Sequence, residues 1–190
     1  MRSAYTRFIV FTVACVALLV GLLWINFRFA GQLPKDSDFS IQWNTARLWV
    51  VEGVNPYDPQ VAKSNQAFAT ENGTTEEPSQ KSYAFVHPLY AMLFFAPFGP
   101  IDYASARALW MTLLELSLLG TGWFGLKLSG IKGGGMKRLG LLFFAALGFY
   151  GVWGVLDGQF AILNAFWISL AIYLIQKKQY IDAGLVMALS

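Results

Sequence analysis

The stretch FIVFTVACVALLVGLLWINF, residues 8–27, contains no charged side chain. About 20 apolar residues in a helix cross the hydrocarbon layer of a bilayer, so the stretch predicts a membrane-spanning helix. Arg2 and Arg7 precede it, which favours a cytoplasmic amino end. A cleaved signal peptide is the rival interpretation, but the run is long for one, and Arg28 stands where cleavage requires a small residue. We therefore interpret the stretch as an uncleaved anchor.

The composition of the chain points to the same class of protein. Of its 190 residues, 56% are hydrophobic and only 13% are charged, and the mean hydropathy is +0.48. A soluble domain carries about 25% charged residues, so the composition excludes an ordinary soluble domain. The expected fold class is an all-α polytopic membrane protein in which residues 1–190 form part of one membrane domain.

Further apolar runs and the basic residues between them predict the path of the chain. Three complete runs lie at residues 104–126, 139–156 and 160–175. Lysine and arginine fill the gaps after the first and the third of these runs, and cytoplasmic loops are enriched in both residues. This pattern predicts alternating crossings that leave the loop at residues 28–82 and the turn at Asp157 on the outer face.

Two segments do not fit a complete crossing. Residues 83–98 are apolar but short and contain Pro88 and Pro97, so an interfacial or re-entrant helix is expected there. A last apolar run begins at residue 180 and stops at Ser190, after about half the length of a span. Half a span would leave backbone groups unsatisfied in lipid, so the chain is expected to be the amino-terminal part of a longer protein.

The long loop after the first predicted span holds a predicted helix. Apolar residues recur in it at helical spacing, at Phe39, Trp43, Ala46 and Val50. With Asp38 as its N-cap and Gly53 as its stop, this helix is expected to lie on the membrane surface with its aromatic side chains toward lipid. Residues 63–81 are polar, and we expect them to be mobile without a ligand.

Asp38 is the first candidate for chemistry. Its plain role would be that of an N-cap, which is worth about 1 kcal/mol of helix stability. A rigidly held carboxylate beside the bilayer could also be a general base that deprotonates an acceptor hydroxyl. Asp36 and Asp38 together could hold a divalent metal, but two carboxylates are too few to specify such a site. The sequence therefore predicts no metal site and no cofactor.

Three further polar residues are expected at the membrane depth of Asp38. His87, the only histidine, precedes the short helix, where it could bind phosphate or handle a proton, unless it is structural. Asp157 and Gln159 belong to a predicted tight turn between two spans. Turn chemistry alone would explain Asp157, but polar groups gathered at one membrane depth also mark functional pathways.

Two charged residues lie within the second predicted span. Arg107 is near its outer end and could face a lipid phosphate or anchor the helix at the interface. Glu115 is eight residues further, about 12 Å along a helix, so the two do not form an obvious pair. The sequence assigns Glu115 no partner.

Several short motifs, in order, resemble those of the GT-C glycosyltransferases, in particular glycosyltransferase family 87. The outer-loop signature is carried by Asp38, Phe39, Trp43, Ala46, Gly53, Pro56 and Tyr57. Residues 85–89 (FVHPL) look like the family's Tyr-Pro-Pro-Leu-type segment, with His87 in place of the first proline. Gly158 and Gln159 with Asn164 look like its Gly-Gln-x-Asn-type helix start, with a looser spacing.

The resemblance implies a GT-C-like helical bundle with a helical outer loop, and an enzyme of the plasma membrane that acts on the cell envelope. Such an enzyme is a hexosyl- or pentosyl-transferase that moves mannose or arabinofuranose from a polyprenyl phosphate donor to a hydroxyl of a lipid or glycan acceptor. Asp38 would be the catalytic base. The other residues expected to bind substrate are Asp36, Gln42, Arg47, Tyr57, His87, Arg107, Asp157 and Gln159.

Two alternatives remain open at this point. A membrane transporter or lipid-handling protein would carry charged or broken helices at the middle of the bilayer, where only Glu115 qualifies. An inactive truncated fragment is the other alternative, because the chain alone would lack helices that complete the site. Membrane lipids are expected partners in every case, and a nucleic acid is not.

Overall fold

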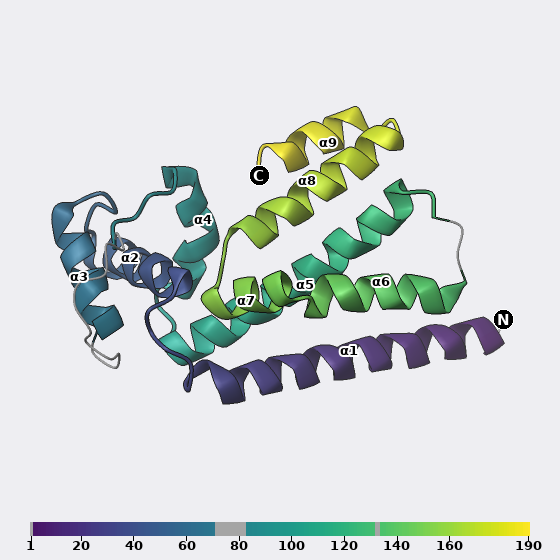
Figure 1. Cartoon of the computed structure of the whole chain (residues 1–190), viewed down its shortest axis with the longest axis horizontal. Helices are drawn as coiled ribbons and strands as arrows, with labels where there is room; N and C mark the ends of the chain where they lie inside the picture. Colours follow the sequence, from purple (N-terminus) through teal and green to yellow (C-terminus); the bar gives the residue numbers. More distant parts are fainter. Residues whose placement is uncertain (1, 71–82, 132–133) are drawn as a thin grey trace.

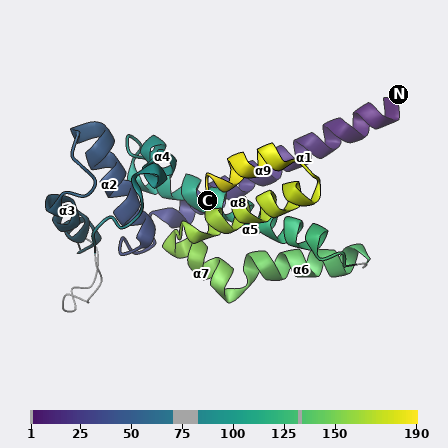
Figure 2. The ribbon, with the colours of Figure 1, turned by 90° about the horizontal axis from the view of Figure 1, so that it is seen from above.

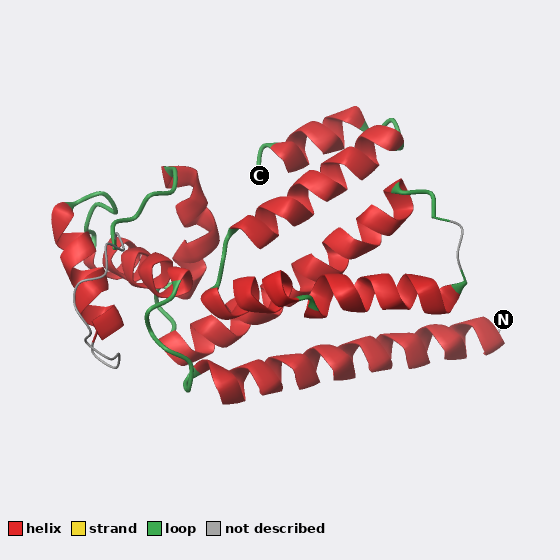
Figure 3. Ribbon diagram, in the orientation of Figure 1, coloured by secondary structure: helices red, strands yellow, loops and turns green. Residues whose placement is uncertain are grey.

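The computed structural model describes residues 2–70, 83–131 and 134–190. Throughout this described part the regular elements are helices, as Figure 3 shows, which confirms the predicted all-α class. In chain order they are α1 (Arg2–Ala30), α2 (Asp38–Glu52), α3 (Pro59–Thr70), η1 (Leu89–Ala91), α4 (Met92–Phe95), η2 (Ala96–Phe98), α5 (Tyr103–Leu128), α6 (Gly135–Leu147), α7 (Phe149–Asp157), α8 (Ala161–Gln176) and α9 (Tyr180–Met187).

The helices form two regions (Figures 1 and 2). We call α1 with α5 to α9 the bundle; in it, α5 packs against α1, α6 and α8, and α9 packs against α8. We call α2, α3 and residues 83–101 the end cluster. It lies at the end of the bundle where α1 and α7 finish and where α5 and α8 start. The alternating path predicted from the sequence also brings these same helix ends together.

The bundle contains fewer complete spans than the apolar runs predict. Two helices are long and apolar enough to cross a membrane, over Phe8–Ala30 and Tyr103–Leu128. The run predicted at residues 139–156 is broken between α6 and α7, which meet at an angle of 45° and could together make a third span. The run at residues 160–175 becomes the 16-residue α8, which is about 24 Å long and shorter than the roughly 30 Å hydrocarbon layer.

Helix α2 begins one residue earlier than the sequence suggests. Ser37, not Asp38, is the N-cap: its side chain accepts a hydrogen bond from the backbone N–H of Ser40, and the Ser40 hydroxyl oxygen accepts one from the N–H of Ser37. Two serine hydroxyls therefore satisfy the orphan donors, which leaves the Asp38 carboxylate outside this cap. Gly53 ends the helix in the left-handed conformation, with φ of 71°, as predicted.

The expectation that α2 lies on a membrane surface is wrong. All residues from 39 to 46 are buried, so the first half of the helix is enclosed on every side, whereas residues 50–52 at its end are exposed. Its apolar side packs on α5 and on the segment of η1, α4 and η2, while its polar side faces α3. Helical spacing revealed the apolar stripe only; the polar residues between are buried because other segments supply their hydrogen bonds.

A buried amide network joins α2 to α3. The Asn44 side-chain amide donates to the side-chain oxygens of Ser64 and Asn65, at 3.1 and 2.8 Å. The Asn65 amide in turn donates to the Thr45 hydroxyl and to the backbone carbonyl of Tyr83, at 3.0 and 2.9 Å. Residues 63–70 are therefore an ordered part of α3, which corrects the predicted mobile segment there; residues 71–81 lie outside the described part.

The segment at residues 83–98 is helical only from Leu89, and Leu89–Phe98 is too short to cross a membrane. This supports the expectation of a short helix that does not cross; one side of the helix packs on α2, and the other exposes Leu89 and Leu93. The Trp43 indole N–H fixes its end by donating to the carbonyls of Phe98 and Ile101, both at 3.1 Å.

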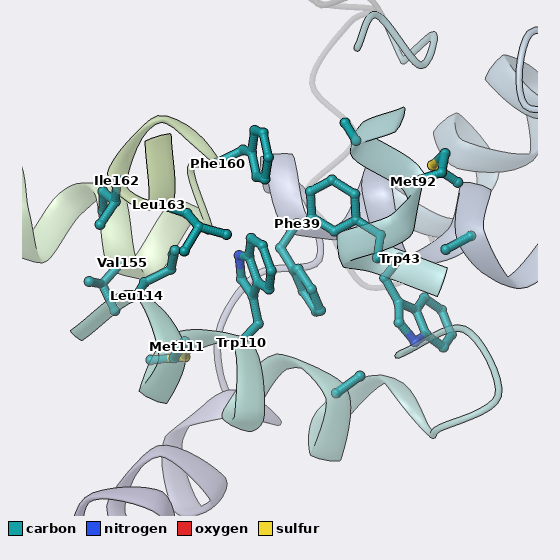
Figure 4. Packing of buried hydrophobic residues seen from close by; sticks show 14 of the residues in the cluster. Phe39, Trp43, Met92, Trp110, Met111, Leu114, Val155, Phe160, Ile162 and Leu163 are labelled. Carbon is teal, nitrogen blue, oxygen red and sulfur yellow. The ribbon is translucent and has the colours of Figure 1, made fainter. Parts of the chain in front are cut away.

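Aromatic side chains fill the junction between the end cluster and the bundle. Figure 4 shows Phe39 of α2 lying beside Trp110 of α5, with Phe160 on the far side of the indole. The rings of Phe39 and Trp110 are stacked with centroids 5.7 Å apart. The indole N–H of Trp110 also donates to the carbonyl of Gly158 at 3.0 Å. The turn between α7 and α8 is thus held directly against the start of α2.

Candidate functional site

The start of α2 and the turn after α7 meet at the junction. The backbone N–H of Asp38 donates to Oδ1 of Asp157 at 3.3 Å, across 119 positions of sequence. Gln159 lies in the same place, because its side-chain amide donates to Oδ2 of Asp157 at 3.3 Å. The structure therefore brings together three of the residues that the sequence singled out.

Asp157 also has a structural task. Its carboxylate lies at the amino end of α2, where the exposed backbone N–H groups and the helix dipole favour a negative charge. The turn itself forms as predicted, because Gly158 adopts φ of 77° and ends α7 in the left-handed conformation. Asp157 thus positions Asp38 by holding the end of its helix, whatever else it contacts.

His87 is the third group at this site. The Nε2 atom of the ring lies 3.1 Å from the side-chain amide nitrogen of Gln42 in α2. If that amide donates, Nε2 is the acceptor and the ring proton is on Nδ1. Burial lowers the pKa of His87 below its ordinary value of 6.5, and the negative charge of Asp38 opposes this in part. The ring is therefore a neutral imidazole at neutral pH.

Gln42 and Tyr57 hold His87 from two sides. The Tyr57 hydroxyl donates to the backbone carbonyl of His87 at 2.8 Å, which ties the turn after α2 to the start of the short helix. Gln42 is buried, and its Oε1 atom has no hydrogen-bond partner among the described residues. Both residues thus belong to the His87 environment, and Gln42 brings an unsatisfied acceptor to it.

Arg107 does not face lipid, which corrects the expected phosphate contact. The side chain is 2% exposed. Its guanidinium donates to the backbone carbonyls of Leu33, Pro34 and Leu156 and to the Tyr103 hydroxyl, at 2.8 to 3.3 Å. These bonds hold the loop after α1 and the end of α7 together, so Arg107 fixes the backbone on two sides of the site.

A small pocket of about 190 Å³ lies beside the start of α2; Ser37 lines it, whereas Asp38 does not. We call it the polar pocket because three of its lining residues are charged, although most of its surface is apolar. Its charged lining residues are Asp36, Arg107 and Asp157, and Trp153 adds an aromatic wall. Two carboxylates, one guanidinium and an indole offer both hydrogen-bonding groups and an apolar face. Such a mixture suits a polyhydroxylated ligand of small size, since each hydroxyl needs a partner while the ring faces need an apolar surface.

Arg47 lies away from this constellation. It is exposed, with its guanidinium carbon 5.8 Å from the centre of the Trp43 ring. Nine residues separate it from Asp38, which is about 13 Å along a helix. This geometry does not bring Arg47 into contact with a small ligand bound at Asp38. Within the described residues, no three histidine, cysteine, aspartate or glutamate side chains are placed to hold a metal ion.

An apolar groove in the bundle contains a hydrogen-bonded pair of polar side chains that the sequence did not predict. The side-chain amide of Asn26 in α1 donates to Oε2 of Glu115 at 2.7 Å and to the Thr112 hydroxyl at 3.0 Å. Both Asn26 and Glu115 line a cavity of about 450 Å³ between α1, α5, α6 and α7 whose other walls are apolar. Asn26 sits within the apolar run of α1, so the only signal for it was a polar residue in a predicted span.

The groove and the polar pocket are neighbours. Leu156 lines both cavities, and Val155 and Asp157 on either side of it line one each. The end of α7 therefore separates an apolar channel in the bundle from a charged pocket at its end.

Comparison with known proteins does not assign this chain to a family. No protein-family model, no curated protein and no solved structure matches the chain. The geometry of the site and of the cavities is therefore the basis for assigning a function.

Proposed function

We propose that the protein is a membrane glycosyltransferase that moves a sugar from a polyprenyl phosphate to a hydroxyl acceptor. The observation that carries the proposal is the meeting of Asp38 with Asp157 and Gln159, next to His87, at the end of a bundle of apolar helices. A transferase of this kind requires a carboxylate at the membrane edge, within reach of a lipid-borne substrate.

Asp38 is the proposed general base. The acceptor hydroxyl oxygen attacks the anomeric carbon of the sugar, and its proton passes to the Asp38 carboxylate. The bond from the anomeric carbon to the phosphate oxygen breaks, and the polyprenyl phosphate leaves with the electron pair. This single displacement inverts the configuration at the anomeric carbon. Asp157 acts on Asp38 as a positioning residue, because it holds the amino end of α2.

The two adjoining cavities support a lipid-linked donor. A donor of this class joins an apolar chain to a phosphate and a sugar. The groove of about 450 Å³ offers apolar walls, and the pocket of about 190 Å³ offers charged and aromatic ones, with Leu156 between them. A ligand with this division of polarity would bury its chain in the first and its sugar in the second.

The proposal includes a location. Arg2 and Arg7 before α1 and the basic residues between α5 and α6 support an amino terminus on the cytoplasmic side, and we propose the plasma membrane as the location. The end cluster then lies on the outer face, so the acceptor is a lipid or a glycan of the cell envelope. Mannose and arabinofuranose are the sugars to test first.

The test is sugar transfer by the purified protein in detergent, with a radiolabelled polyprenyl-phosphate sugar as donor. Asp38→Asn preserves the shape of the side chain but not its basicity, and we expect it to lower the turnover by at least about a hundred-fold. Asp182→Asn, which removes the same charge from the exposed start of α9, is the matched control and should retain activity. Asp38→Asn activity near that of the control would refute the assignment.

A lipid-handling protein without transferase activity is the second candidate, and the Asn26–Glu115 pair favours it. Ionisable residues within a membrane segment are rare and usually functional, and this pair lies in the groove instead of at the proposed catalytic end. The two candidates differ in turnover. Binding of the labelled donor with no transfer to any acceptor, and no effect of Asp38→Asn on that binding, would favour lipid handling.

A further inference from the structure

The end of the bundle opposite the end cluster carries a second polar pocket. It has a volume of about 170 Å³ and lies where α5 ends and α6 begins. Figures 1 and 2 place this end of the bundle on the same side of the molecule as the amino terminus, far from α2 and α3. Its lining residues are Trp123, Leu126, Lys127, Gly130, Ile131 and Arg138.

Two cations from different helices converge on this pocket. Lys127 comes from the last turn of α5 and Arg138 from the first turns of α6. Both are exposed, and within the described residues neither forms an ion pair. The sequence offers them little compensation, because Glu115 is the only acidic residue from Tyr103 to Leu156. The pocket thus has a strong positive charge with no balancing carboxylate.

The other walls of the pocket are apolar. The ammonium group of Lys127 lies 4.7 Å from the centre of the Trp123 ring, which is itself 49% exposed. Leu126 and Ile131 continue the apolar surface. Indole rings gather at the boundary between headgroups and hydrocarbon, so the pocket combines a phosphate-binding pair with contacts for the glycerol and the upper chain of a lipid.

We propose that this pocket binds the headgroup of an anionic phospholipid. Lys127 and Arg138 bind the phosphate from two sides, Arg138 with its planar fork and Lys127 as a point charge. Trp123 packs against the glycerol region. Basic pockets between helices at the cytoplasmic end of a membrane protein are known to bind anionic headgroups in this way. The positive-inside tendency explains why cations lie at this end, but not why two of them line one cavity with an indole.

The proposal is independent of the transferase assignment. It uses no residue of the end cluster, and it predicts lipid selectivity in a protein with or without catalytic activity. The chemical source of the phosphate is a lipid, because the pocket lies at the ends of two apolar helices and half of its lining is apolar.

The experiment is native mass spectrometry of the purified protein in detergent, titrated with dioleoyl phosphatidylglycerol or with dioleoyl phosphatidylcholine. We expect tight retention of one phosphatidylglycerol and weaker retention of phosphatidylcholine. Removing both charges in Lys127→Gln/Arg138→Gln should weaken phosphatidylglycerol binding about thirty-fold, from about five-fold for each charge near a membrane surface. Lys127→Arg/Arg138→Lys keeps both charges and should retain most of the binding.

The matched control is Lys177→Gln/Lys178→Gln. It removes two charges from the exposed turn between α8 and α9, where Lys177 also lies over an aromatic ring, 5.5 Å from the centre of Tyr173. An equal loss of binding in the two double variants would mean that only net charge attracts the lipid, and would overturn the proposal. Displacement of the lipid by an equimolar amount of inorganic phosphate would also overturn it, because a free phosphate would then be the ligand. A circular dichroism spectrum equal to that of the parent verifies that each variant folds.

Discussion

The end cluster and the bundle differ in how much of their apolar side chains is exposed. In the end cluster and at its junction, large aromatic residues such as Phe39 and Trp110 are completely buried. In the bundle, Leu18 and Phe144 are 74% and 77% exposed. The same hydrophobic residues therefore serve as a packed core in one region and as an outer surface in the other.

The difference shows which solvent each region meets. Soluble proteins rarely expose large continuous apolar surfaces, so the surface of α1 and α6 is that of a region covered by lipid or by further helices. The end cluster instead has a core of buried aromatic residues, although Tyr57 and Tyr90 are about half exposed. It also buries Asn44, Asn65 and Thr45, each of which has a hydrogen-bond partner. The end cluster can therefore hold side chains in fixed positions in water, which a site for chemistry requires.

Among the variants that test this comparison, Trp110→Ala is expected to lower the free energy of unfolding most. Trp110 has no exposed surface, stacks on Phe39 and donates to Gly158, so its loss leaves a cavity at the junction. We expect a loss of about 3–5 kcal/mol in the free energy of unfolding. Thermal unfolding in detergent, followed by circular dichroism, measures it. Trp123→Ala is the control, because Trp123 is 49% exposed; equal losses in the two variants would mean that the junction is not a packed core.

A second pair of variants tests the contact between the turn and α2. Gly158 and Gly53 both have left-handed backbones, with φ of 77° and 71°. A Cβ on Gly158 would overlap Phe39, whereas one on Gly53 meets nothing within 4 Å. We expect Gly53→Ala to cost about 1 kcal/mol of unfolding free energy, from conformation alone, and Gly158→Ala about 2–4 kcal/mol. Chemical unfolding measures both, and similar costs would argue against close packing of the turn on α2.

Asn65→Ala tests the buried amide network of the end cluster. The substitution removes one of the two acceptors of the Asn44 amide and the Asn65 donor to the carbonyl of Tyr83, so we expect a loss of about 1–3 kcal/mol. Hydrogen exchange of α3 should accelerate more than that of α5, since the network ties α3 to α2. Gln66→Ala, at an exposed position of the same helix, is expected to leave exchange unchanged; accelerated exchange in this control would contradict the network's role.

The smallest expected effect is a pH dependence from His87. Its pKa is lowered by burial in the folded protein, whereas the unfolded chain binds a proton near the ordinary value of 6.5. The unfolded state therefore binds more protons in the window below pH 6.5, so stability falls as the pH drops from that value toward the folded pKa and is complete above it. Because His87 is the only histidine, His87→Asn should remove its part of the slope just below pH 6.5 in thermal unfolding. An unchanged slope would place its origin in the carboxylates.

Local patterns predicted much of the fold. Charge-free runs of sufficient length predicted α1 and α5, and a stop signal at Gly53 predicted the end of α2. Local patterns failed where contacts between residues distant in sequence decide whether a side chain is buried. The periodicity of α2 revealed its apolar stripe, but the partners of Gln42 and Asn44 come from His87 and α3, so the burial of every residue from 39 to 46 was not predictable. Arg107 was misjudged for the same reason, because its partners are backbone carbonyls of the loop after α1 and of the end of α7.

The candidate site shows the same division. The expectation that Asp38, His87 and Asp157 lie at one membrane depth followed from the alternating path, and the structure brings them together. The hydrogen bond between Asp38 and Asp157 was not predictable, because it depends on how the turn after α7 packs on α2. Glu115 was correctly noted as deep in a span, but its partner Asn26 comes from another helix.

The sequence by itself determined that this is a helical protein with an apolar bundle, because length and hydrophobicity of a run decide whether a helix can cross a bilayer. It also determined where polar residues gather along the path. The tertiary structure alone decided which of them touch, since a contact between residues 119 positions apart depends on the packing of Phe39, Trp110 and Gly158 at the junction. It also decided that α6 and α7 bend by 45° and that Leu156 lies between two cavities. Local sequence restricts each helix separately, whereas a site is formed by the surfaces on which helices meet.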